Sequence, residues 1–173
     1  RNILAIKSYK IILQRREMET SIGEFKVGTK MKSQGRTISE GDFTAMANLS
    51  WENGSLHMDR EFMKNSQFGE RILGGPCIIP FVAGLSSHPL HNILDRSHVR
   101  LVALVGIENI RFTTPLHPGD TIYVETEVIK VRQTSNRQRW LVHMQDTAYK
   151  HDGNAIMNME RIVLMEEGTN KSE

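Results

Sequence analysis

A carboxylate and a histidine, Glu52 and His57, lie five residues apart and are separated by a polar turn that contains glycine. Such a pair can hold a water between two proton-transfer groups, as the addition of water to a carbon–carbon double bond requires. An imidazole suits this role because it takes up and returns a proton near neutral pH. We therefore predict that Glu52 and His57 are catalytic. The alternatives are a histidine that caps the next helix and an exposed loop carboxylate.

A glycine pair precedes the most apolar stretch of the chain, in the order Gly74-Gly75-Pro76. Glycines that open a buried helix leave free backbone N–H groups, which can polarise a carbonyl oxygen. Pro76 has no N–H group, so Gly75 is the predicted oxyanion donor at the helix mouth. The alternative is that Gly75 only permits close packing there.

Gly74, Cys77 and Arg111 are the candidates for substrate binding. Cys77 occupies an apolar position without an activating partner nearby, which favours a small core residue over a nucleophile. Arg111 lies on a predicted strand and could contact a phosphate or carboxylate, or serve only as a surface charge.

Three histidines, His88, His91 and His98, follow the apolar stretch in a segment that we predict to be a loop. Their spacing matches no known zinc pattern, so we expect solvated loop histidines and no metal. The basic run 136–139 lacks interleaved aromatic residues, which argues against nucleic-acid binding.

The composition is that of an ordinary globular chain of 173 residues with a net charge of +2 and one cysteine. The single cysteine fits a reducing compartment, and no apolar run approaches the length of about 18 residues expected of a membrane-spanning helix. Residues 1–20 contain no acid before Glu17 and predict an extension outside the core, followed by one domain over 21–167 and a flexible tail over 168–173. We expect a cytoplasmic protein, with the mitochondrial matrix as the alternative if the extension is a presequence.

The order of predicted elements indicates an α+β fold with an antiparallel sheet. Ser39 and Asp42 predict a helix start by a capping box, and the helix runs to about Leu49. A short helix follows over 60–67, and the buried helix is predicted over 72–85. Strands are predicted over 101–112, 121–131, 138–149 and 155–165, with an edge strand over 30–34.

An ordered set of motifs resembles the MaoC-like acyl-CoA dehydratases, the group of (R)-specific enoyl-CoA hydratases. The set comprises Thr37-Ile38-Ser39-Glu40-Gly41-Asp42-Phe43, Leu56-His57-Met58-Asp59, Phe68-Gly69-Glu70-Arg71-Ile72, Asn109-Ile110-Arg111-Phe112 and Pro115-Leu116-His117-Pro118-Gly119-Asp120. The resemblance covers roughly 25–165. It implies a hotdog fold, in which an antiparallel sheet wraps a long helix, and a dimer or larger assembly that binds a thioester near the subunit interface.

The chain departs from the signature of that family in its catalytic loop. Glu52 stands where the family has aspartate, Gly54 where it has asparagine and Ser55 where it has proline, whereas His57 matches. The usual His-Gly pair appears as Gly74-Gly75, and Ala83 replaces a frequent serine. Some hydratases of dicarboxylyl-CoA substrates, such as mesaconyl-CoA, also depart from the signature around this loop.

The resemblance implies a hydro-lyase that hydrates a 2-enoyl thioester of CoA or a carrier protein to a 3-hydroxyacyl thioester, without a cofactor. A non-catalytic hotdog subunit, which binds a thioester or a partner, is the rival, and an acyl-CoA thioesterase is a weaker alternative.

Overall fold

The structure is a computed structural model that describes residues 21–168. The hairpin strands β1 (Ser21–Ile22) and β2 (Phe25–Lys26) precede the short strands β3 (Lys30–Lys32) and β4 (Arg36–Thr37). The helices are α2 (Glu40–Ser50), α3 (Ser55–Met58), α4 (Arg60–Lys64) and α5 (Gly75–Ser97). The long strands are β5 (Val99–Phe112), β6 (Thr121–Gln133), β7 (Arg139–Lys150) and β8 (Ala155–Glu167). The predicted extension over 1–20 lies outside the described residues, as do residues 169–173 of the predicted tail.

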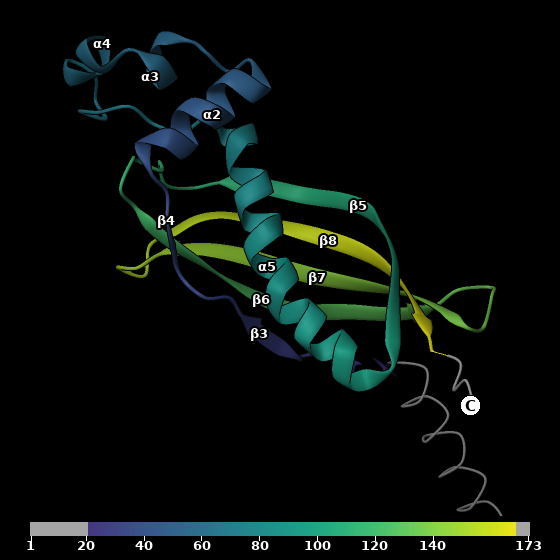
Figure 1. Cartoon of the computed structure of the whole chain (residues 1–173). Coiled ribbons are helices and arrows are strands. Elements are labelled where there is room, and N and C mark those ends of the chain that lie inside the picture. Colours follow the sequence, from purple (N-terminus) through teal and green to yellow (C-terminus); the bar gives the residue numbers. More distant parts are fainter. Residues whose placement is uncertain (1–20, 169–173) are drawn as a thin grey trace, which may run out of the picture.

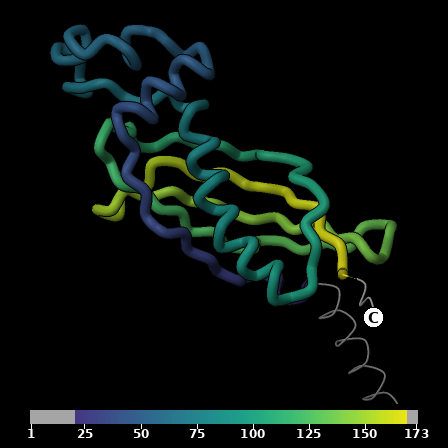
Figure 2. Tube along the Cα trace, in the orientation of Figure 1, coloured from purple at the N-terminus to yellow at the C-terminus, as the bar shows by residue number. Residues whose placement is uncertain are grey.

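The chain adopts the predicted α+β hotdog fold. The sheet has the order β3-β6-β7-β8-β5, with β4 also paired to β6, and every pairing in it is antiparallel. Helix α5 lies along one face of this curved sheet, and α2, α3 and α4 gather beyond one end (Figure 1; Figure 2). Among residues 21–168, no helix is long and apolar enough to cross a membrane.

The four long strands begin and end within two residues of their predicted bounds. Along β6, β7 and β8 the side chains alternate between buried and partly exposed positions, most regularly along β7, because successive strand residues point to opposite faces. The predicted edge strand is also present: β3 pairs with β6 over Lys30–Lys32.

The central helix is longer than predicted, because α5 continues past Leu85 to Ser97 and contains both Pro80 and Pro89. An interior proline costs about 3 kcal/mol. Each of the buried residues Leu90, Ile93 and Leu94 offsets part of this by about 1.5–3 kcal/mol. The expected loop around His88 and His91 was therefore wrong: both residues lie on α5.

The helix that leads to the site starts as predicted. The N–H of Asp42 donates to Ser39 Oγ at 3.1 Å, and the Ser39 N–H donates back to Asp42 Oδ2 at 2.8 Å. The backbone N–H and hydroxyl of Ser39 lower the pKa of the Asp42 carboxyl, with a further contribution from Arg36. A carboxylate in the first turn also matches the positive end of the helix dipole, so α2 begins at a fixed point.

A buried ion pair divides the core between α5 and the sheet. Asp146 on β7 is fully buried, and the side chain of Arg161 on β8 is 4% exposed. Arg161 donates through Nε and through Nη2, the latter at 3.0 Å, and Thr126 Oγ1 donates to the same carboxylate at 2.5 Å. An apolar cluster that includes Leu90 and Trp140 lies to one side, and a cluster that includes Cys77 and Met157 lies to the other.

We expect Asp146→Asn to lower the free energy of unfolding by about 3–5 kcal/mol, because it leaves the Arg161 charge buried without its counterion. Urea denaturation would measure this loss. The matched control is Asp95→Asn on the exposed side of α5, which should change stability by less than about 0.5 kcal/mol. Equal losses in the two variants would contradict this account.

Candidate active site

The end of α2 turns the chain so that Glu52 returns toward α5. Trp51 ends the helix with a φ of 64°, in the left-handed region that residues other than glycine seldom adopt. Ser50 is the last residue of α2, and its Oγ lies 3.3 Å from the Glu52 nitrogen and accepts that N–H. The same oxygen lies 3.0 Å from Cys77 Sγ, in the first turn of α5. The backbone of Glu52 is therefore tied to α5 through Ser50.

His57 lies on the one-turn helix α3, where the sequence predicted only a turn. Its Nδ1 lies 2.7 Å from the carbonyl oxygen of Ile72. A carbonyl can only accept, so Nδ1 carries the proton of this bond and Nε2 of the neutral ring has a free lone pair. The partner of one ring nitrogen thus determines the chemistry available at the other.

The structure brings Glu52 and His57 together. The distance between Glu52 Oε2 and His57 Nε2 is 3.6 Å, and the side chains are 42% and 14% exposed, respectively. This separation exceeds a direct hydrogen bond, so both atoms can accept from one water placed beside them. The lone pair of His57 Nε2 and the carboxylate of Glu52 lie close enough to act on the same molecule, so one of them can remove a proton and the other can deliver one.

The two glycines at the start of α5 have different surroundings. A Cβ added to Gly74 would lie 3.4 Å from Glu52 Oε2 and 3.5 Å from His57 Nε2. A Cβ added to Gly75 would instead meet the ring of Phe112 at 2.9 Å. Gly74 is therefore the residue beside the acid–base pair, and the lack of a side chain at Gly75 lets Phe112 pack against the helix.

Among the described residues, the other predicted candidates form no hydrogen bond or ion pair with the side chains of Glu52 and His57. Cys77 is 1% exposed and packs in the core. Arg111 is exposed on β5, and its Nη1 donates to the neighbouring Ile110 carbonyl at 2.8 Å. Within residues 21–168, no three His, Cys, Asp or Glu side chains are grouped as metal ligands, and His98 is the C-cap of α5.

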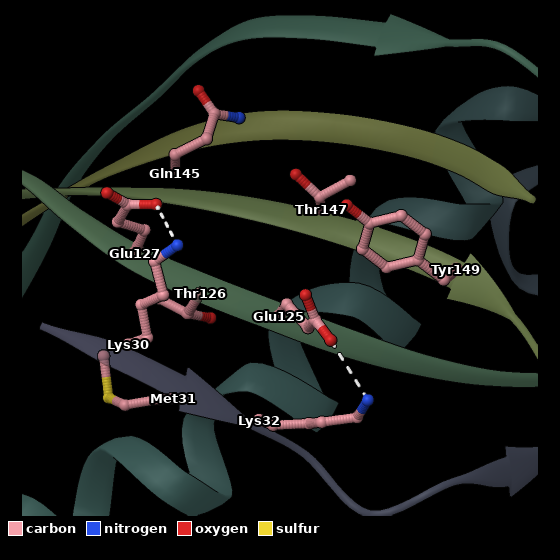
Figure 3. Close-up of a pocket in the computed structure, with 9 residues that line it drawn as sticks. All are labelled: Lys30, Met31, Lys32, Glu125, Thr126, Glu127, Gln145, Thr147 and Tyr149. Carbon is pink, nitrogen blue, oxygen red and sulfur yellow. Dashed lines mark hydrogen bonds and ion pairs between the residues drawn. The ribbon is translucent and has the colours of Figure 1, made fainter. Parts of the chain in front are cut away.

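A separate hollow of about 370 Å³ lies on the face of the sheet that points away from α5 (Figure 3). It shares no residue with the pair. Its cations and carboxylates contact each other, with Lys32 Nζ 3.0 Å from Glu125 and Lys30 Nζ 3.4 Å from Glu127. The charges that line this hollow are therefore paired with each other.

Two contributors to the site could not be found from the sequence. The Ile72 carbonyl is a backbone group, and any residue type supplies one. Ser50 was an ordinary polar residue at a helix end until its contacts with Glu52 and Cys77 were known.

The fold and the site thus define a hotdog domain in which a carboxylate and an imidazole lie 3.6 Å apart at the mouth of the central helix. The sequence profile described as the MaoC-like domain matches residues 24–149. The chain belongs to this family, which confirms the resemblance inferred from the motifs.

Protein MaoC of Klebsiella aerogenes is 34% identical to the chain over 116 residues, which make up 67% of the chain and 32% of that protein. Beta-methylmalyl-CoA dehydratase of Chloroflexus aurantiacus is 29% identical over 107 residues, or 61% of the chain and 28% of that protein. The chain thus spans about a third of the length of these relatives. Among solved structures, R-hydratase PhaJ1 of Pseudomonas aeruginosa is similar with a TM-score of 0.61 and 25% identity, over 86% of this chain and 87% of that one.

For the hydration of enoyl thioesters that is proposed below, we expect Gly74→Ala to lower the rate with a crotonyl thioester about 10-fold or more, because the new methyl group would displace a water between Glu52 and His57. The matched control is Gly84→Ala on the same helix, where an added Cβ meets nothing within 4 Å. Initial rates and thermal midpoints of both variants would be compared with the wild type. A fully active Gly74→Ala protein would contradict a water at this position.

Proposed function

We propose that this chain is a hydro-lyase that reversibly hydrates a 2-enoyl thioester to a 3-hydroxyacyl thioester. The observation that supports it best is the approach of Glu52 Oε2 to His57 Nε2, 3.6 Å apart, while Nδ1 is held by Ile72. The chain belongs to the MaoC-like family, and its fold is similar to that of R-hydratase PhaJ1 of Pseudomonas aeruginosa.

In this reaction the pair removes one proton from water as its oxygen attacks the β-carbon of the double bond. The pair also delivers one proton to the α-carbon. Transfer of a proton between Glu52 and His57 then returns both residues to their starting states, so the pair gains and loses no proton overall. Electron density moves onto the thioester oxygen during the attack. The backbone N–H groups of Gly74 and Gly75 are the proposed donors to that oxygen, aided by the positive end of α5.

The roles of the pair predict that Glu52→Gln and His57→Gln each lower hydration about 10²-fold or more, because each removes one proton-transfer group. Glu167→Gln at the end of β8 and His91→Gln in the second half of α5 are the controls, since both residues are exposed and, among the described residues, neither is hydrogen-bonded to Glu52 or His57. The assay follows loss of the enoyl double bond, with folding checked by circular dichroism. Near-normal turnover by His57→Gln would rule out this mechanism.

The same assay, extended to measure thiol release and thioester binding, distinguishes the hydratase from two other functions. Release of free thiol from an acyl thioester, without hydration, would indicate a thioesterase. Binding of a thioester without either reaction would indicate a non-catalytic subunit, which the altered positions Gly54 and Ala83 favour.

The class of acyl group is the finer part of the proposal. A relative of this chain is named a Beta-methylmalyl-CoA dehydratase, so a dicarboxylyl enoyl-CoA such as mesaconyl-CoA is the substrate to test beside crotonyl-CoA. Parallel assays of CoA and carrier-protein thioesters would distinguish the two carriers.

A homodimer is part of the proposal, because within residues 21–168 β5 has one neighbour in the sheet and leaves its other edge unpaired. Leu104, Val105 and Phe112 on this strand are large apolar residues that are 46–52% exposed. Natural proteins seldom leave such an edge uncovered. A twofold pairing of β5 with its copy would bury it.

We therefore expect Val105→Lys to weaken dimerisation, because a charge at the interface must be desolvated. Sedimentation velocity over a range of protein concentrations would compare it with the wild type and with Val27→Lys, which adds the same charge at an exposed valine beyond β2. A wild-type chain that stays monomeric at every concentration would exclude the dimer, and equal effects of both variants would place the interface elsewhere.

A further inference from the structure

His57 depends on contacts from outside its own helix. Helix α3 has four residues, and so short a helix has too few internal hydrogen bonds to be stable alone. The last carbonyl groups of a helix also have no partner within it. The position of the His57 ring is therefore determined by the groups that bind α3 from other parts of the chain.

Two consecutive residues, Arg71 and Ile72, supply these contacts. The Ile72 N–H donates to the Leu56 carbonyl at 3.3 Å, and the Ile72 carbonyl accepts from His57 Nδ1 at 2.7 Å. Arg71 Nη1 lies 3.4 Å from the His57 carbonyl oxygen and donates to it. The segment thus binds His57 at the ring and at the backbone.

The guanidinium group of Arg71 also connects α3 to α2. Its Nη2 pairs with the carboxylate of Glu40, the first residue of α2, while Nη1 faces His57. The Arg71 side chain is 12% exposed, so water competes weakly for these donors, whereas the Glu40 side chain is 57% exposed. A planar group with separate donors can make both contacts at once, which a single ammonium cannot do with the same geometry.

We propose that Arg71 is a positioning residue for His57, and this proposal rests on the hydratase function proposed above. Without Arg71, the backbone of His57 would lose its anchor, and the bond between Nδ1 and the Ile72 carbonyl would no longer form in every molecule. A shift of the backbone would move Nε2 away from Glu52, and a displacement of about 1 Å can cost about 10²-fold in rate. Arg71 itself need not touch the substrate.

The test compares Arg71→Gln with two matched variants. Glu40→Gln removes the ion-pair partner but keeps the contact between Arg71 and His57. Arg60→Gln removes a guanidinium group from an exposed position on α4. We expect Arg71→Gln to lower kcat about 10- to 10²-fold with less than a threefold change in KM. Both other variants should stay within about threefold of the wild type in kcat.

The second readout does not need activity. Nitrogen-15 spectra of labelled histidine, assigned with His57→Gln, report which ring nitrogen of His57 carries the proton. We expect the Nδ1–H form in the wild type, in Glu40→Gln and in Arg60→Gln, and a mixture of tautomers or a broadened signal in Arg71→Gln. This change should appear even if no thioester is hydrated, which separates a failure of this inference from a failure of the proposed function.

Unchanged kcat and an unchanged His57 signal in Arg71→Gln would overturn the inference. If Arg71→Gln loses its cooperative unfolding transition, Arg71→Lys replaces it, because lysine keeps the charge but cannot make both contacts. The inference then requires a larger His57 signal change in Arg71→Lys than in Glu40→Gln. A larger His57 signal change in Glu40→Gln than in Arg71→Lys would show that Arg71 acts only through its ion pair with Glu40. That result would also overturn the inference.

Discussion

The buried pair of Asp146 and Arg161 constrains the rest of this structure. Two charges that are removed from water must remain in contact, because the loss of either partner leaves the other unpaired at a cost of several kcal/mol. Since they lie on neighbouring strands, the pair favours one register of β7 against β8, and the hydroxyl of Thr126 extends the same requirement to β6. A shift of one strand by one residue would turn its charge to the opposite face, away from its partner, and bring a neighbouring side chain into the core.

This register determines where α5 can lie. The buried side chains of the helix lie over the same sheet face as the ion pair, and they contribute to both apolar clusters. Packing on both sides of the pair accounts for a helix of 23 residues that tolerates two interior prolines. With α5 fixed, its N-cap Gly74 lies beside Glu52 and His57, and Cys77 in its first turn lies beside Ser50. The geometry of the site thus follows from packing some distance away.

Local signals predicted much of the fold. The capping box of Ser39 and Asp42, the four long strands and the edge strand depend on neighbouring residues, and all are present. The length of α5 was mispredicted because Pro89 disfavours a helix locally, whereas the burial of Leu90 and its neighbours depends on a sheet that forms later in the chain. At the site, the approach of Glu52 to His57 followed from their spacing. The Ile72 carbonyl and the Ser50 hydroxyl had no distinctive sequence signal, since their importance depends on tertiary contacts.

The departures from the family signature can be understood together. Glutamate is longer than aspartate by one methylene group, about 1.5 Å, so its carboxylate needs additional room beside the histidine. Gly74 is the nearest part of α5, and the absence of a side chain there leaves 3.4 Å between the position of a Cβ and Glu52 Oε2. A histidine at this position, as the family signature has it, would extend several atoms into the same space. The longer acid and the missing side chain therefore fit together, and they leave Glu52 Oε2 3.6 Å from His57 Nε2.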